Sequence, residues 1–104
     1  MAFYDLNEME AEKQDGSQRK VLQGKNLTLV FIERDPNFVQ EHSHPHEQMV
    51  CLMEGKMKVR LGDEEREIEA GQVVHIPGDM SHRIETLTSA RIISIYSPPR
   101  GATP

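Results

Sequence analysis

Turn-forming residues interrupt this chain at short intervals, and their spacing limits what it can fold into more than any other feature. Glycine and proline recur about every ten residues between positions 55 and 78, which leaves no room for an amphipathic helix. Short apolar runs, rich in residues that favour β-strands, lie between the turns. We therefore predict an all-β protein, either a sandwich or a barrel.

The strands are expected at residues 19–23, 27–33, 38–44, 47–53, 57–61, 66–69, 73–76, 82–86 and 90–96. A single helical turn is the only helical structure expected, within residues 6–13. The length of 104 residues fits one domain. Within it, we expect an amino-terminal arm or strand at residues 1–17, the barrel at 18–97 and a tail at 98–104.

The charge of the chain argues against a nucleic-acid partner. The formal net charge is -5, and no basic block is longer than Arg19-Lys20, whereas phosphate backbones require clustered Lys and Arg. The single cysteine, Cys51, gives no sign of an oxidising compartment. No signal peptide or membrane-spanning apolar stretch is visible. We therefore expect a cytoplasmic protein without membrane association.

Two of the expected strands are apolar on both faces. Cys51 and Met53 alternate with other apolar residues in one of them, and Ile93 and Ile95 do so in the last. Such strands must be covered on both sides. The cover is either the amino-terminal segment or a second subunit, and we expect a homodimer.

Histidines cluster at two places in the chain. Residues two apart on a strand point to the same face, so His42 and His44 can converge on one ion. Gln48 shares their parity and can face the same interior if the strand bends without a change of register. His82 follows the turn Pro77-Gly78-Asp79-Met80-Ser81. Neutral imidazoles bind divalent transition metals, and an amide oxygen binds hard or borderline cations.

Two further histidines are assigned other places. His46 has the parity of the proposed ligands, but Pro45 turns it out of line, so we expect it at the rim or beside a ligand. His75 lies in an apolar strand and is expected to have a structural role. The sequence thus predicts one divalent ion, either Zn, Ni, Mn, Fe or Co, held by His42, His44, Gln48 and His82.

This pattern resembles the two motifs of the cupin superfamily. The first motif, His-x-His followed by Glu and Gly, corresponds to His42, His44, Gln48 in the Glu place, and Gly55. The second, Gly, Pro-x-Gly and His, corresponds to Gly71, Pro77, Asp79 in the last Gly place, and His82. The resemblance implies a single-domain cupin, which is a double-stranded β-helix or jelly-roll barrel.

Within this superfamily the chain is similar to small cupins of the pectin-degradation KdgF type. The string from His42 to Gln48 and the ending Ser97-Pro98-Pro99-Arg100 carry this likeness. It implies three His and one Gln as metal ligands, and conversion of unsaturated monouronates into linear keto forms. The family's last strand has an Asp for proton transfer where this chain has Ser94, then Tyr96 in a Phe place, and Arg100 holding the sugar acid.

Three functions are compatible with these residues. The first is a metal-dependent isomerase or lyase acting on a small sugar acid, with Tyr96 and Arg100 as catalytic residues. A serine hydroxyl does not titrate near neutral pH, so Ser94 cannot replace the carboxylate base. That departure favours the second function, a metal-dependent module that binds or senses a small molecule without turnover. The third is a metal-dependent dioxygenase, which requires a redox-active ion.

Overall fold

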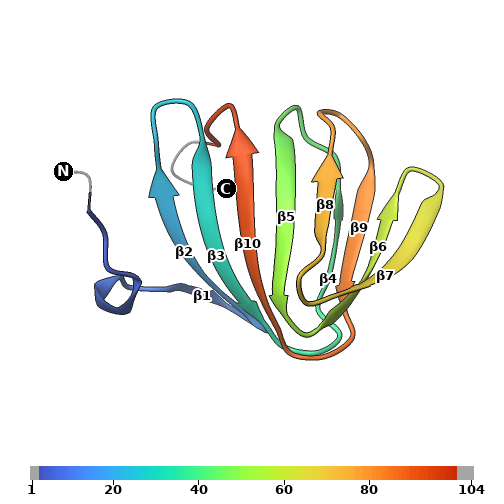
Figure 1. The fold of residues 1–104 in the computed structure, drawn as a ribbon, viewed down its shortest axis with the longest axis horizontal. Coiled ribbons are helices and arrows are strands. Elements are labelled where there is room, and N and C mark those ends of the chain that lie inside the picture. The colour runs from blue at the N-terminus through green and yellow to red at the C-terminus, as the bar shows by residue number, and fades with distance from the viewer. Residues whose placement is uncertain (1–2, 101–104) are drawn as a thin grey trace.

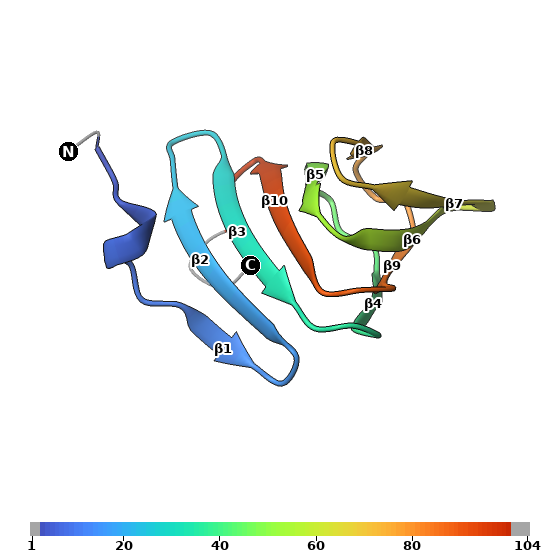
Figure 2. The same cartoon turned by 60° about the horizontal axis from the view of Figure 1, so that its bottom comes forward.

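The computed structural model describes residues 3–100, and its strands form two antiparallel sheets (Figure 1). The strands are β1 (Glu12–Gln14), β2 (Ser17–Gln23), β3 (Thr28–Arg34), β4 (Val39–His42), β5 (Glu47–Glu54), β6 (Lys56–Leu61), β7 (Glu64–Glu69), β8 (Val73–Ile76), β9 (His82–Thr86) and β10 (Ala90–Ser97). One sheet has the order β1-β2-β3-β10-β5-β8, and the other has the order β4-β9-β6-β7. Figure 2 shows them as two facing walls. The prediction of an all-β jelly roll is confirmed.

The core lies between the two sheets and follows the two-residue period of the strands. On β9, His82, Ile84 and Thr86 are buried, and the alternate residues Arg83 and Glu85 are half-buried. Each strand that faces the interior contributes apolar side chains at one parity, which is how a sheet separates its two faces. The buried apolar residues are Val30, Ile32, Val50, Leu52, Met57, Val59, Val74, Ile76, Ile84, Ala90, Ile92 and Tyr96.

Gly55 turns the chain from β5 into β6. Its φ of 97° lies in the left-handed region, which glycine adopts without steric cost. A Cβ atom there would also collide with the carbonyl oxygen of Ser89. Both constraints explain why the hairpin between β5 and β6 has glycine at this position.

Two features of the observed strands differ from the sequence-based expectation. The strand expected at 38–44 ends at His42, so His44 lies in the bend that leads through Pro45 to β5. The expected helical turn is a short 3-10 helix, Leu6–Glu8, and β1 follows it and pairs with β2. The sequence of β1, Glu-Lys-Gln, is entirely polar and exposed, so no apolar pattern marked it as a strand.

Among residues 3–100, no helix is long and apolar enough to cross a membrane.

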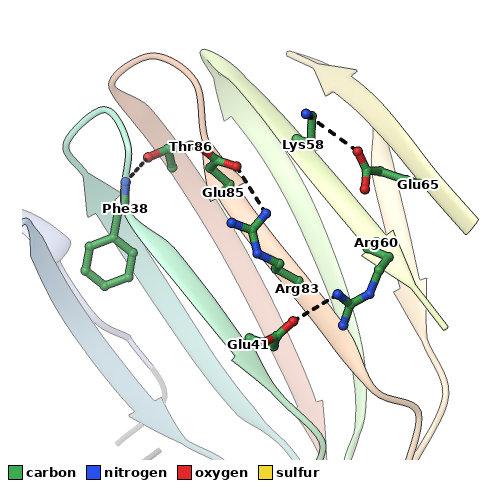
Figure 3. A network of polar contacts seen from close by, with 8 residues as sticks. All are labelled: Phe38, Glu41, Lys58, Arg60, Glu65, Arg83, Glu85 and Thr86. Carbon is green, nitrogen blue, oxygen red and sulfur yellow. Dashed lines mark hydrogen bonds and ion pairs between the residues drawn. The ribbon is translucent and has the colours of Figure 1, made fainter. Parts of the chain in front are cut away.

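The outer faces of the two sheets differ, because part of the larger one is apolar. Figure 3 shows ion pairs on the smaller sheet, where Arg60 lies 2.9 Å from Glu41 and Lys58 lies 3.5 Å from Glu65. Exposed apolar side chains instead gather on the outer face of β5, β8 and β10. They are Met49, Met53, Val73 and Ile95, with exposed fractions of 45%, 50%, 56% and 39%.

The turn before β4 is fixed by a buried threonine of β9. The hydroxyl of Thr86 accepts a hydrogen bond from the backbone N–H of Phe38 at 2.9 Å (Figure 3) and donates one to the carbonyl oxygen of Asp35. Thr86 is fully buried. These bonds fix the start of β4 against β9, and so set where His42 lies relative to His82.

Candidate metal centre

Three histidine rings meet inside the barrel. His42 on β4 and His82 on β9 are register partners in adjacent strands, and their ring centroids are 4.6 Å apart. His44 lies two residues beyond His42, and its ring centroid is 5.1 Å from that of His42 and 5.0 Å from that of His82. One nitrogen from each ring lies within 4.8 Å of the others. Three imidazoles in this arrangement could hold a metal ion.

The loops that carry His44 and His82 are held together by backbone contacts. The N–H of Asp79 donates to the carbonyl oxygen of His44 at 2.7 Å. Asp79 occupies the motif's glycine place with a φ of 65°, a left-handed conformation that Asp tolerates better than most residues. A Cβ atom on Gly78 would lie 2.6 Å from the carbonyl oxygen of Pro45, so glycine permits this close approach.

Backbone carbonyl groups set the tautomers of two of these rings. Nδ1 of His82 lies 3.0 Å from the carbonyl oxygen of Met80, and Nδ1 of His44 lies 3.0 Å from that of His46. A carbonyl oxygen only accepts, so each Nδ1 carries the proton and each Nε2 presents a lone pair. Nε2 of His82 is buried without a hydrogen-bond partner. An orphaned acceptor of this kind is what an imidazole ligand offers to an ion.

Gln48 on β5 completes the arrangement from the opposite sheet. Its Nε2 donates to the Tyr96 hydroxyl at 3.0 Å and to the Ser94 hydroxyl at 3.4 Å. That orientation directs Oε1 toward Nε2 of His44, 3.0 Å away. Two acceptors at this distance repel each other unless a cation lies between them. Two ligands at right angles, each about 2.1 Å from one ion, are separated by about 3.0 Å, so the donor set fits a divalent metal.

Burial and neighbouring positive groups favour the neutral forms of His42 and His82. Burial, followed by the neighbouring His82 and His44, lowers the pKa of His42 from 6.5 to about 4. Burial also lowers the pKa of His82, although its hydrogen bond to Met80 opposes this. Neutral imidazole is the form that binds a metal. His42 is therefore able to offer its lone pair well below neutral pH.

Tyr96 and Arg100 lie next to the amide of Gln48. Tyr96 and Ser94 are buried on the interior face of β10, and the guanidinium of Arg100 stacks over the Tyr96 ring, 4.6 Å from its centroid. The backbone N–H of Arg100 donates to the Thr28 hydroxyl at 2.9 Å, which fixes the start of the tail. The phenol, a guanidinium and the candidate metal position therefore lie close together.

The structure thus brings together His42, His44, Gln48, His82, Tyr96 and Arg100, which the sequence proposed as site residues. His46 lies beside them, with its ring centroid 5.7 Å from that of His44. His75 is not part of the cluster. It lies on the exposed side of β8, with its Nε2 2.6 Å from a carboxylate oxygen of Glu47.

Sequence analysis missed two polar residues of the same interior, Arg34 and Gln40. Arg34 ends β3 at the inward parity set by Thr28 and Val30, and Gln40 shares the parity of His42 on β4. A charged residue at an inward position of an otherwise apolar strand was the available signal.

The depressed pKa of His42 predicts how the metal-free protein responds to acid. The unfolded chain takes up a proton near pH 6.5, whereas folded His42 does so near pH 4. The free energy of unfolding therefore falls as pH falls between these values. Urea titrations in EDTA should show this fall, with a smaller pH dependence in His42→Asn. An equal dependence in wild type and His42→Asn would contradict the assignment.

Comparisons with known proteins agree with this geometry. The model of the cupin domain family matches residues 28–96. The polyketide synthase CurC of Streptomyces cyaneus is 30% identical over 108 residues, which cover 90% of this chain and 68% of that protein. The structure of KdgF from Halomonas sp. superposes with a TM-score of 0.90, at 25% identity, covering 97% of this chain and 96% of that one.

A second solved structure has the same degree of similarity. It is an RmlC-like cupin from Shewanella frigidimarina NCIMB 400, with a TM-score of 0.91, 25% identity, and coverage of 97% of this chain and 94% of that one. The resemblance to small cupins of the KdgF type is thereby confirmed. The family model covers most of the strands, and the His-x-His and Pro-x-Asp-x-x-His motifs occupy their expected places. This chain therefore belongs to the cupin domain family.

Proposed function

We propose that this protein uses a divalent metal ion, held by His42, His44, Gln48 and His82, to bind a small carboxylate such as a sugar acid. The observation that carries the proposal is the unrelieved contact between two acceptors, Nε2 of His44 and Oε1 of Gln48, beside the orphaned Nε2 of His82. A shared cation satisfies all three atoms at once. Such an ion would act as a Lewis acid toward a ligand oxygen.

The electrostatics of the site favour an anionic ligand. Three imidazoles and one amide are neutral, so they leave the full charge of a bound ion uncompensated. Among the groups that shift the pKa of His42, His46 or His82, none is a carboxylate, and Arg100 acts on all three. A ligand that carries a carboxylate would supply the missing negative charge.

The residues beside the metal position suggest how such a ligand is held. Arg100 presents a planar fork suited to a carboxylate. The Tyr96 hydroxyl accepts a hydrogen bond from Gln48, so its own proton remains available to a ligand oxygen. Ser94 holds the Gln48 amide and offers no group that titrates near neutral pH. The likeness to KdgF supports a uronate as ligand and ring opening as the reaction class, with Tyr96 or water as the proton carrier.

A second candidate ligand follows from the similarity to the polyketide synthase CurC. Polyketides carry closely spaced carbonyl oxygens, and the enolate formed when such a pair loses a proton chelates a metal ion through two oxygens. A site with neutral ligands would bind this anion for the same electrostatic reason. A dioxygenase is the third possibility, and it would show oxygen uptake with Fe, Mn or Ni.

The apolar outer face of β5, β8 and β10 supports a homodimer. In the register of these strands, Met49 lies opposite Ile95 on one side and His75 on the other, and Cys51 lies opposite Val73. The 3-10 helix of the amino-terminal arm reaches the β2 side, where the Lys20 ammonium donates to the carbonyl oxygen of Leu6. The arm thus leaves Met49, Val73 and Ile95 exposed, and a second copy would cover them.

Metal content tests the first proposal directly. Purified protein should contain about one divalent ion per chain by elemental analysis, and EDTA should lower its melting temperature because the ion binds only the folded state. His82→Ala and Gln48→Ala should each reduce metal affinity by more than about 100-fold, since even outer-shell partners are worth about 10- to 100-fold. His75→Ala is the matched control. Equal metal affinity in all four proteins would refute the ligand assignment.

Turnover is tested with an unsaturated monouronate as substrate. Its conversion is measured by the loss of ultraviolet absorbance and by chromatography. We expect metal-dependent ring opening that is slow in wild type. Ser94→Asp should accelerate it by about 100-fold or more, because it supplies a general base. Metal-dependent binding without turnover in either protein would assign the chain to the non-catalytic class. Chelation of a β-diketone probe in place of the uronate would favour the second candidate ligand.

The oligomeric state is tested by sedimentation velocity. Ile95→Glu introduces a charge into the apolar outer face and should convert a dimer into monomers. Val39→Glu is the matched control, since Val39 is 47% exposed on β4 of the smaller sheet, and it should leave the dimer intact. A monomeric wild-type protein would remove this part of the proposal.

A further inference from the structure

Arg34 is a buried cation at the inner face of the larger sheet. It ends β3, is only 7% exposed, and follows Thr28, Val30 and Ile32 at the inward parity. Its Nη2 donates to Oε1 of Gln40 at 2.8 Å, and its guanidinium lies over the Phe38 ring, 4.7 Å from the centroid. Its Nε is buried without a hydrogen-bond partner.

The charge of Arg34 has no counter-ion among residues 3–100. Burial lowers its pKa to about 10, so it remains a cation at neutral pH. The charged or titratable groups that act on it are Tyr96 and Arg19, and no carboxylate is among them. A guanidinium has five N–H donors, and here a single hydrogen bond is made. Burying an unpaired charge lowers the stability of the folded protein, and an anion bound to the charge would reduce this cost.

Arg34 belongs to the same interior as the candidate metal centre. Its partner Gln40 lies two residues before His42, on the same side of β4. The charge of Arg34 contributes to the lowered pKa of His42, and the phenol of Tyr96 interacts with the guanidinium in turn. Arg34 and Arg100 therefore both act on the His42 ring, so a ligand at the metal position would experience two positive charges.

We propose that Arg34 is a second anion-binding position, which pairs with an acidic group of the ligand remote from the metal. The ligand class is then a small organic acid with two acidic groups, one held at the metal and Arg100 and the other at Arg34. The metal end rests on the function proposed above. Gln40 and Phe38 are positioning residues, since they hold the guanidinium by a hydrogen bond and by stacking.

Calorimetric titration of metal-loaded protein tests this inference. The probes are malonate, succinate and glutarate, compared with acetate and butyrate at constant ionic strength. Dicarboxylates also chelate a metal through both groups, so the decisive quantity is how far their advantage depends on Arg34. In Arg34→Met the best dicarboxylate should lose about tenfold or more in affinity, as expected for a charge-assisted hydrogen bond. The monocarboxylates should change little.

Matched variants separate this role from a structural one. Arg60→Met removes a guanidinium paired with Glu41 on the outer face and should leave all affinities unchanged. Without ligand, a folded Arg34→Met protein should melt no lower than wild type, because the substitution removes an uncompensated charge. If Arg34→Met does not fold, Arg34→Gln takes its place in the calorimetric titrations.

The failures of the two proposals are distinguishable. If no metal binds, or no carboxylate binds the metal-loaded protein, the proposed function fails. If mono- and dicarboxylates bind but the advantage of the dicarboxylates is the same in wild type and in the Arg34 variants, only the role of Arg34 fails. Arg34→Lys should retain part of the higher affinity for dicarboxylates, because lysine keeps the positive charge but lacks the planar guanidinium that binds both carboxylate oxygens.

Discussion

The contact between Nε2 of His44 and Oε1 of Gln48 is the constraint on which the rest of the site depends. The tautomer of His44 is fixed by a backbone carbonyl, and the amide of Gln48 is fixed by Tyr96 and Ser94. While the His44 ring is neutral, neither acceptor can turn into a donor without breaking its own hydrogen bonds. The fold therefore holds two lone pairs against each other, an arrangement that a shared cation would relieve. In the function proposed above, that cation is a divalent metal ion.

Each of the two sheets contributes side chains to the candidate site. His42 and His82 are register partners on the smaller sheet, whereas Gln48 and Tyr96 are register partners on the larger one. The ion position thus lies between the walls of the jelly roll, where side chains of inward parity converge. Thr86 fixes the turn from Asp35 to Phe38 by two hydrogen bonds. This turn sets where β4 starts, and therefore where His42 lies along the strand.

Much of this was predictable because strand parity is a local property. The two-residue period placed His82, Ile84 and Thr86 inward, and it grouped Ser94 with Tyr96. The period fails where tertiary contacts decide. β1 is polar throughout and forms because β2 offers it an edge. The apolar run around His75 gave no sign that its side chain lies on an exposed face, where it pairs with Glu47; its structural role stays a prediction. The homodimer and a cytoplasmic location stay predictions.

At two positions where this chain departs from the motifs, the change removes negative charge from the interior. The general cupin motif has Glu where this chain has Gln48, and the KdgF-type strand has Asp where it has Ser94. Both departures replace a carboxylate with a neutral side chain, while Arg34 and Arg100 add positive charge to the same space. A bound divalent ion increases that excess. In the function proposed above, the ligand supplies the negative charge, so the number of acidic groups on the ligand would determine how tightly it binds.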